Sequence, residues 1–100
     1  MTHELKTDPK AFQAVFEGKK TFEIRKNDRG FQVGDELWLQ ETVYTGEEMK
    51  PRHDGAYPGK TIPGKPLDYT GRMISRTVTY ILHGPVYGLA SGWCIMSITP

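Results

Sequence analysis

Cysteine is almost absent from this chain, since Cys94 is the only one in 100 residues. A single cysteine cannot form an internal disulfide, which excludes the disulfide-stapled class of small secreted domain and indicates a reducing compartment. The sequence also has no apolar run near the roughly 20 residues that cross a bilayer. Met1–Lys6 shows no hydrophobic stretch after its charges, so we expect no signal peptide and a cytoplasmic location.

Motifs for metals and cofactors are lacking as well. His3, His53 and His83 show no ligand spacing with one another or with Cys94, and no Cys-x-x-Cys pair occurs. The strand–glycine–helix order of a phosphate loop is also missing. We therefore expect no metal and no cofactor.

Charge is nearly balanced over the chain, with a formal net value of +1. The exception is Lys19–Arg29, which holds five basic and two acidic residues. A local basic patch can recruit phosphates without a high overall pI. Charge alone nevertheless favours an ordinary solvated turn here.

Apolar periodicity predicts five strands and one helix within a single domain, residues 1–100. Asp8 and Pro9 are typical of a helix start, and Phe12, Val15 and Phe16 form one apolar stripe. Such an α+β, mainly β pattern predicts a small closed or half-closed barrel. The predicted elements are strands at Thr2–Lys6, Thr21–Lys26, Glu36–Glu41, Met73–Leu82 and Trp93–Thr99, and a helix at Pro9–Glu17.

Alternation along Thr21–Lys26 assigns each residue to one face of the strand. Phe22 and Ile24 are expected to point into the core, and Glu23 and Arg25 to share the opposite face with Thr21.

Two further strands have distinct patterns. Leu37 and Leu39 are expected to face inward while Trp38 faces away. The nearly continuous apolar run Trp93–Thr99 predicts a central strand buried on both faces.

A long excursion separates the third and fourth of these strands. The segment 43–71 holds four of the seven prolines and five of the eleven glycines, without a sustained period. A structureless loop of this length is unusual in a compact domain, so it is either functional or mobile. We favour a long hairpin with a disordered tip.

The segment Gly18–Arg25 holds the most informative chemistry. Glu23 and Arg25 stand side by side on one strand face, a donor–acceptor pair suited to a planar heterocycle or a phosphate. Lys20 adds a point charge near the turn. An exposed salt bridge of about 0–1 kcal/mol is an equally good interpretation, as is a purely structural pairing of Glu23 with Arg25.

These residues match the motif G-x-K-x-x-E-x-R, and on this basis the chain resembles the ASCH superfamily of PUA-like domains. It is most similar to a bacterial and phage-borne subgroup, DUF3850, over almost the whole chain except Val43–Asp68. Besides the motif, the resemblance rests on His3–Lys6, Glu23–Arg29, Val33–Asp35, Tyr69–Arg72 and Gly88–Leu89.

The resemblance implies a PUA-like barrel of about five to six strands, with one N-terminal helix and the motif in a cleft between barrel and helix. It also implies RNA-related ligands, because related PUA and YTH-type barrels bind RNA or modified bases. One ASCH branch hydrolyses N4-acetylcytidine with a threonine nucleophile at the motif position that Glu23 occupies here. This departure argues against amide hydrolysis, although Glu23 as general base with Lys20 as electrostatic support is a conceivable catalytic pair.

Our leading hypothesis is a non-catalytic module that binds RNA or a modified nucleobase. Alternatives are a small amidohydrolase acting on an N-acylated nucleoside, and a phage-derived regulator that binds protein through the excursion. An aromatic side chain is expected to stack on the base, with Trp38 and Tyr87 preferred. The candidate ligand-binding residues are Lys20, Thr21, Glu23, Arg25, Lys26, Arg29, Trp38 and Tyr87.

Overall fold

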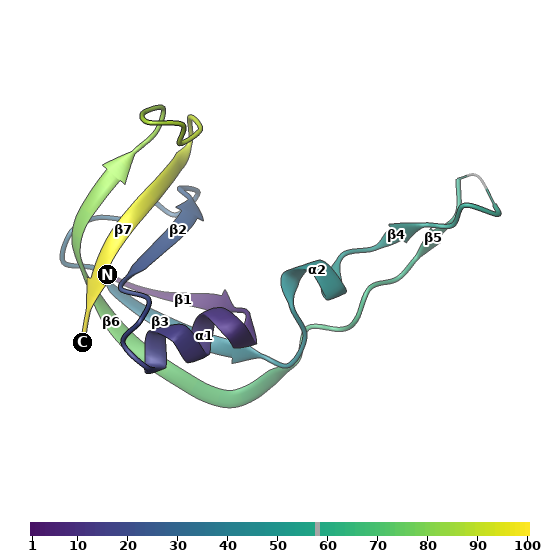
Figure 1. Cartoon of the computed structure of the whole chain (residues 1–100), viewed down its shortest axis with the longest axis horizontal. Helices are drawn as coiled ribbons and strands as arrows, with labels where there is room; N and C mark the ends of the chain where they lie inside the picture. The colour runs from purple at the N-terminus through teal and green to yellow at the C-terminus, as the bar shows by residue number, and fades with distance from the viewer. Residues whose placement is uncertain (58) are drawn as a thin grey trace.

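Five strands form one curled sheet in the computed structural model, which describes residues 1–57 and 59–100 (Figure 1). The strand order is β1-β3-β6-β7-β2; β1 pairs with β3 in parallel and the other pairs are antiparallel. β1 and β2 are therefore the two edges. The expectation of a mainly β fold with an N-terminal helix is confirmed. The strands are β1 (Thr2–Thr7), β2 (Phe22–Lys26), β3 (Glu36–Thr42), β6 (Tyr69–His83) and β7 (Trp93–Thr99).

The helix α1 (Pro9–Phe16) follows β1 and packs against β3. Phe12 and Val15 are each 1% exposed, as the apolar stripe predicted, but Phe16 is 62% exposed. Phe16 lies in the last turn, where the guanidinium of Arg72 sits 5.3 Å from its ring instead of core residues. Gly18 follows the C-cap of the helix at φ 75°, the left-handed conformation that glycine adopts most readily.

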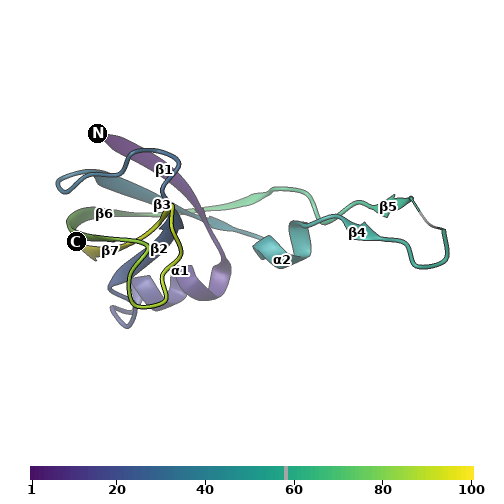
Figure 2. The same cartoon turned by 90° about the horizontal axis from the view of Figure 1, so that it is seen from above.

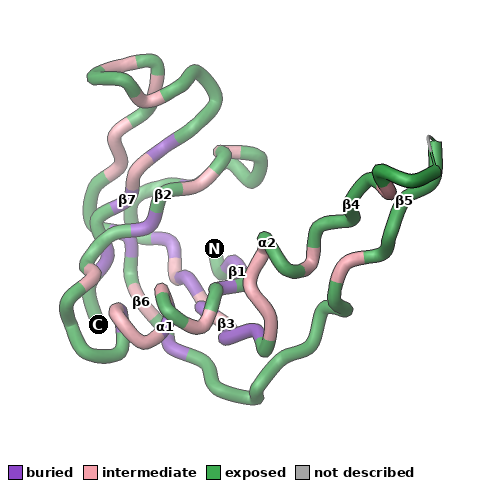
Figure 3. Tube along the Cα trace, turned by 45° about the vertical axis from the view of Figure 1, so that its right-hand side comes forward, coloured by how far each residue is buried: buried purple, intermediate pink, exposed green. Residues whose placement is uncertain are grey.

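The core lies on the concave face of the sheet, between the strands and α1. Leu37 and Leu39 are fully buried as predicted, whereas Trp38 is only half-buried. Figure 3 shows the buried positions alternating along the strands of the sheet, while the projecting segment is almost entirely exposed. The sequence period therefore located this part of the core correctly.

The predicted facing of β2 is wrong. Phe22 and Ile24 are 44% and 47% exposed, while Glu23 is 3% exposed. Register explains this reversal, because Glu23 lies opposite Met96, whose side chain is fully buried in β7. A charged residue thus occupies an inward position that alternation assigns to an apolar one.

Burial on both faces of β7 was also a wrong expectation. Its burial alternates, with Cys94 and Met96 at 0% exposed and Trp93 at 41%. One face of β7 therefore lines the core and the other faces outward.

The excursion is an arm that projects from the sheet (Figures 1 and 2). It starts where the backbone N–H of Val43 donates to the carbonyl of Asp68 at 2.8 Å. β6 begins at Tyr69, so the last three residues of the predicted 43–71 excursion are strand. The predicted disordered tip includes Pro58, which lies outside the described residues. The arm contains α2 (Gly46–Met49), β4 (Arg52–His53) and β5 (Thr61–Ile62).

The helices α1 and α2 are both short. Among residues 1–57 and 59–100, no helix has both the length and the apolarity that a bilayer crossing requires.

Asp35 joins the start of the chain to the turn before β3. Its Oδ2 lies 2.8 Å from His3 Nε2 and accepts from the backbone N–H of Gln32 at 3.0 Å, and its Oδ1 lies 3.2 Å from the amino group of Met1. The hydrogen bond from His3, then those from Gln32 and Met1, outweigh burial and lower the pKa of the Asp35 carboxyl.

This lowered pKa predicts acid sensitivity. The ionised carboxylate contributes stability that is fully present above the ordinary pKa of about 4 and is lost as the pH falls through the lowered folded-state pKa. We expect Asp35→Asn to be less stable than wild type at pH 6 and the difference to shrink towards pH 2.5. Urea unfolding across this range measures it. A difference that stays constant with pH would contradict the assignment.

Candidate functional site

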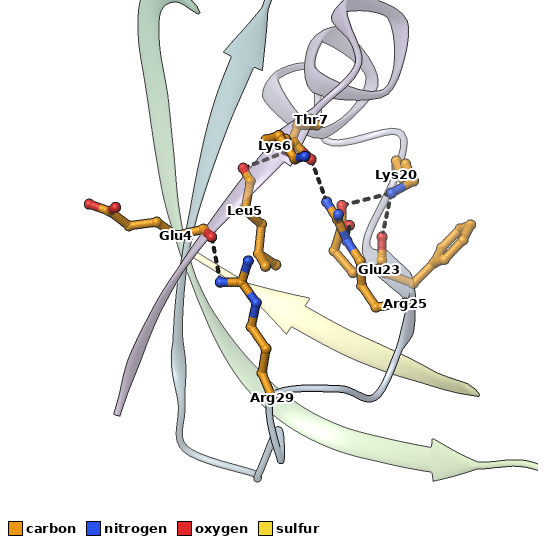
Figure 4. Close-up of polar contacts among 9 residues, drawn as sticks. Glu4, Leu5, Lys6, Thr7, Lys20, Glu23, Arg25 and Arg29 are labelled. Carbon is orange, nitrogen blue, oxygen red and sulfur yellow. Dashed lines mark hydrogen bonds and ion pairs between the residues drawn. The ribbon is translucent and has the colours of Figure 1, made fainter. Parts of the chain in front are cut away.

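Glu23 lies at the centre of a charged chain that joins the motif residues (Figure 4). Lys20 Nζ donates to Glu23 Oε1 at 2.8 Å, and Arg25 Nε donates to Glu23 Oε2 at 3.1 Å. The Lys20 ammonium also donates to the carbonyl of Phe22 at 2.8 Å. The Glu23 side chain is 4% exposed, against 20% for Lys20 and 27% for Arg25. The motif therefore buries one carboxylate between two half-buried cations.

This geometry determines what Glu23 can do. Each carboxylate oxygen already accepts a charge-assisted hydrogen bond, the strongest kind available to it. Each oxygen keeps a second acceptor site, but with the side chain only 4% exposed there is little room for a base amine or a water to reach it. In the observed arrangement Glu23 positions the two cations.

The motif arginine also joins the two edges of the sheet. Arg25 Nη2 donates to the carbonyl of Lys6 at 2.8 Å, and Arg29 Nη1 donates to the carbonyl of Glu4 at 2.7 Å (Figure 4). Both carbonyls belong to the edge strand β1, and both guanidinium groups come from β2 or the turn after it. Side chains thus bridge the gap between β1 and β2 and satisfy an otherwise open sheet edge.

A cleft of about 380 Å³ lies over this bridged gap. Its polar lining comes from four basic residues and one acidic residue, Asp28. The basic residues are Lys6, Arg25, Lys26 and Arg29. The excess of cations makes the cleft suited to an anionic group such as a phosphate.

The apolar part of the same cleft includes an aromatic ring. Trp93 is 41% exposed and Ile24 is 47% exposed, while Phe31 and Leu5 are buried beneath the opening. A planar ring at the rim of a cationic cleft is suited to stacking.

The structure separates the predicted site residues into two groups. Arg25, Lys26 and Arg29 line the cleft, and Lys20 and Glu23 adjoin it through Arg25. The remaining three lie elsewhere.

Thr21, Trp38 and Tyr87 have other positions. The carbonyl of Thr21 accepts from the Ile98 N–H at 3.0 Å. Trp38 lies on β3, facing away from the core, and does not line the cleft. Tyr87 is 93% exposed in the loop between β6 and β7, at φ 49°. Neither of the two aromatics preferred from the sequence borders the cleft.

Sequence reasoning did not select Trp93 for the site, and it missed Lys6. Trp93 was assigned to a strand buried on both faces, and Lys6 only to the end of the first strand. Because neighbouring residues of a strand point to opposite faces, strict alternation along Trp93–Thr99 would have placed the Trp93 indole on the face away from Cys94. Nothing in the sequence indicates that β1 and β2 approach each other.

Metal and thiol chemistry find no support at this site. Within residues 1–57 and 59–100, no group of three or more His, Cys, Asp or Glu side chains is placed to hold a metal ion. Burial raises the pKa of the Cys94 thiol, and a thiol of this kind is a poor nucleophile.

Comparison with known proteins gives two matches. A protein of Escherichia phage P2, described as an uncharacterized 12.9 kDa protein in the GpA 3' region, is 45% identical over 53 residues. That match covers 50% of this chain and 49% of the phage protein, so it spans about half the length of the relative. Residues 2–98 match the family described as Domain of unknown function (DUF3850). With nearly its whole length covered, the chain belongs to the DUF3850 family.

Proposed function

We propose that this protein is a PUA-like module of the ASCH type that binds RNA or a modified nucleobase, with the cleft between β1 and β2 as its ligand site. The observation that supports the proposal best is the set of four cations around an exposed indole in a cleft of about 380 Å³. This volume lies within the roughly 300–1,000 Å³ range of small-ligand sites. A cytoplasmic location accords with such a role.

We expect the two exposed lysines of the cleft, Lys6 and Lys26, to bind phosphate groups. Lys6 and Lys26 are exposed at the cleft, whereas Arg25 and Arg29 use part of their donor capacity on the carbonyls of β1. A guanidinium has five N–H donors, so both arginines keep donors for a ligand. The lysines therefore supply mobile charge, and the arginines supply fixed, pre-oriented donors.

Trp93 is the residue on which we expect a base to stack. The indole lies at the cleft and is 41% exposed, and base–aromatic stacking is worth about 1–3 kcal/mol per base. Because every base has a π-face, this contact does not depend on sequence. A modified base would be selected by the polar groups around the ring.

The burial and hydrogen bonding of the Glu23 carboxylate favour ligand binding over hydrolysis as the function of the cleft. A general base needs an oxygen that can reach water, but the Glu23 side chain is only 4% exposed and lies between Lys20 and Arg25, which donate to its two oxygens. Holding the cations in place is a role that the geometry supports without rearrangement. We therefore place the amidohydrolase alternative second.

Fluorescence and NMR titrations test the proposal. The ligands are uridine monophosphate, N4-acetylcytidine and a single-stranded RNA of about ten nucleotides, with wild type, Trp93→Ala and Trp38→Ala. We expect ligand-induced amide shifts at Lys6, Arg25 and Lys26, and a loss of affinity of roughly 5- to 100-fold in Trp93→Ala. Trp38→Ala is the matched control, because Trp38 lies outside the cleft.

Two results would change the conclusion. If none of the three ligands shifts the amides of the cleft, this ligand class is wrong. Release of acetate from N4-acetylcytidine, seen as a new product signal, would favour the hydrolase instead.

A further inference from the structure

The outer face of β2, β7 and β6 is an exposed surface rich in aromatic and aliphatic side chains. Phe22, Tyr80 and Trp93 are 44%, 61% and 41% exposed, although each belongs to a strand of the main sheet. Large apolar residues are normally turned inward when one face of a sheet is solvated. Three exposed aromatics on one face therefore call for a functional explanation.

Strand register places these side chains together. Ser97 of β7 lies between Phe22 of β2 and Tyr80 of β6, because it pairs with both. One row further on, Ile95 pairs with both Ile24 and Leu82. Residues that pair directly in antiparallel strands project from the same face.

The third row brings Trp93 to the same face, opposite Lys26 of β2. With strands about 4.8 Å apart and residues about 3.4 Å apart along them, the Phe22 and Tyr80 positions are about 10 Å apart. Trp93 lies roughly 13 Å from their row. Separate rings at such spacings suit successive or alternate bases of one strand, because each ring can hold its own base.

Charge on this face favours a polyanion. Among the described residues of β2, β6 and β7, the one carboxylate is that of Glu23, which points to the core. Lysines border the face: Lys26 lies beside Trp93, and Lys20 Nζ lies 5.0 Å from the centre of the Phe22 ring. A surface with exposed rings and bordering cations, whose own three strands carry no outward carboxylate, is complementary to single-stranded nucleic acid. On the neighbouring strand β3, the Glu36 carboxylate accepts a hydrogen bond from Ser75 of β6.

The face is also continuous with the cleft. Ile24, Lys26 and Trp93 belong to both surfaces. An RNA strand with one base stacked on Trp93 would leave the cleft directly over the outer face of β2 and β7.

We propose that the outer face of β2, β7 and β6 is a stacking platform for single-stranded RNA, which extends the cleft from one nucleotide to several. Phe22 and Tyr80 stack the added bases, while Lys26 binds the backbone. This inference rests on the proposed function, because Trp93 belongs to both the cleft and the platform. Phe22 and Tyr80, which test the platform, lie outside the cleft.

The test compares ligands of different length on wild type and a double variant. Phe22→Ser/Tyr80→Ser removes two rings of the platform. Tyr57→Ser/Tyr69→Ser is the control, since both tyrosines are exposed, with Tyr57 on the arm and Tyr69 at the start of β6, in the part of the strand that does not pair with β7. Fluorescence anisotropy gives the affinity for single-stranded RNA of about ten nucleotides, and NMR gives it for uridine monophosphate. Thermal melts followed by circular dichroism check that each variant is folded.

We expect the double variant to bind the RNA at least about 10-fold more weakly and the mononucleotide as wild type does. RNA binding unchanged by the double variant would overturn the platform, and the proposed function would stand. RNA binding that depends on Phe22 and Tyr80 in a protein that does not bind the mononucleotide would support the platform and refute the cleft. If the double substitution instead abolishes a concentration-dependent self-association in sedimentation, without changing RNA affinity, the face is a protein interface and the proposal is wrong.

Discussion

Glu23→Ala is expected to destabilise the fold by about 2–4 kcal/mol, the largest effect we predict for any polar substitution. The change removes the acceptor for both Lys20 and Arg25, whose charges are only 20% and 27% exposed. Breaking a buried ion pair costs about 3–5 kcal/mol because the remaining charge is uncompensated, and partial exposure reduces this figure. For a 100-residue domain the melting temperature should fall by about 10–25 °C.

Glu17→Ala is the matched control for this prediction. Glu17 also pairs with a lysine, at 3.0 Å from Lys19, but both side chains are largely exposed. Such a pair contributes about 0–1 kcal/mol, so the control should melt near wild type. Equal melting temperatures for Glu23→Ala and wild type would show that the motif carboxylate has no structural role and is free for a ligand.

Charge reversal of the two exposed cleft lysines, Lys6→Glu/Lys26→Glu, is expected to lower affinity for single-stranded RNA by about 100-fold or more at physiological salt. Neither ammonium makes a hydrogen bond or ion pair within the described residues, so stability should change little. Loss of two phosphate contacts should also reduce the slope of log affinity against log salt by about 1.4. Anisotropy titrations at several salt concentrations measure both quantities.

Lys10→Glu/Lys60→Glu makes the same change in net charge away from the cleft, on α1 and on the arm. If this control weakens RNA binding as much as the cleft variant, the attraction is a property of the whole molecule and not of the cleft. An unchanged salt slope in the cleft variant would likewise exclude direct phosphate contacts by the two lysines.

Together, the two experiments separate the structural and ligand-binding roles of the basic segment. Lys20 and Arg25 form ion pairs with the buried Glu23 that hold the edge of the sheet, and Arg25 extends this chain to β1. Lys6 and Lys26 lie outside the chain and face solvent. We expect stability to follow the first set and affinity to follow the second.

Local pattern by itself determined the chain order of the five strands of the main sheet, the N-terminal helix and part of the core. Phe12 and Val15 recur at helical spacing, and Leu37 and Leu39 at strand spacing, and all four are buried. The buried positions follow the helical or strand period because the gain from burying apolar side chains fixes which face of the element points to the core. Strand spacing likewise paired Glu23 with Arg25, whereas the ion pair of Lys20 with Glu23 is a finding of the structure.

Only the tertiary structure decided which face of β2 points inward and where the cleft lies. Alternation assigns the apolar residues of a strand to the core, but at the sheet edge two cations compensate the buried Glu23 and leave Phe22 and Ile24 outside. The cleft forms because the sheet curls until β1 and β2 are within reach of arginine side chains. Trp93 joins it through pairing with Lys26 of a strand distant in sequence, and no local period contains that information.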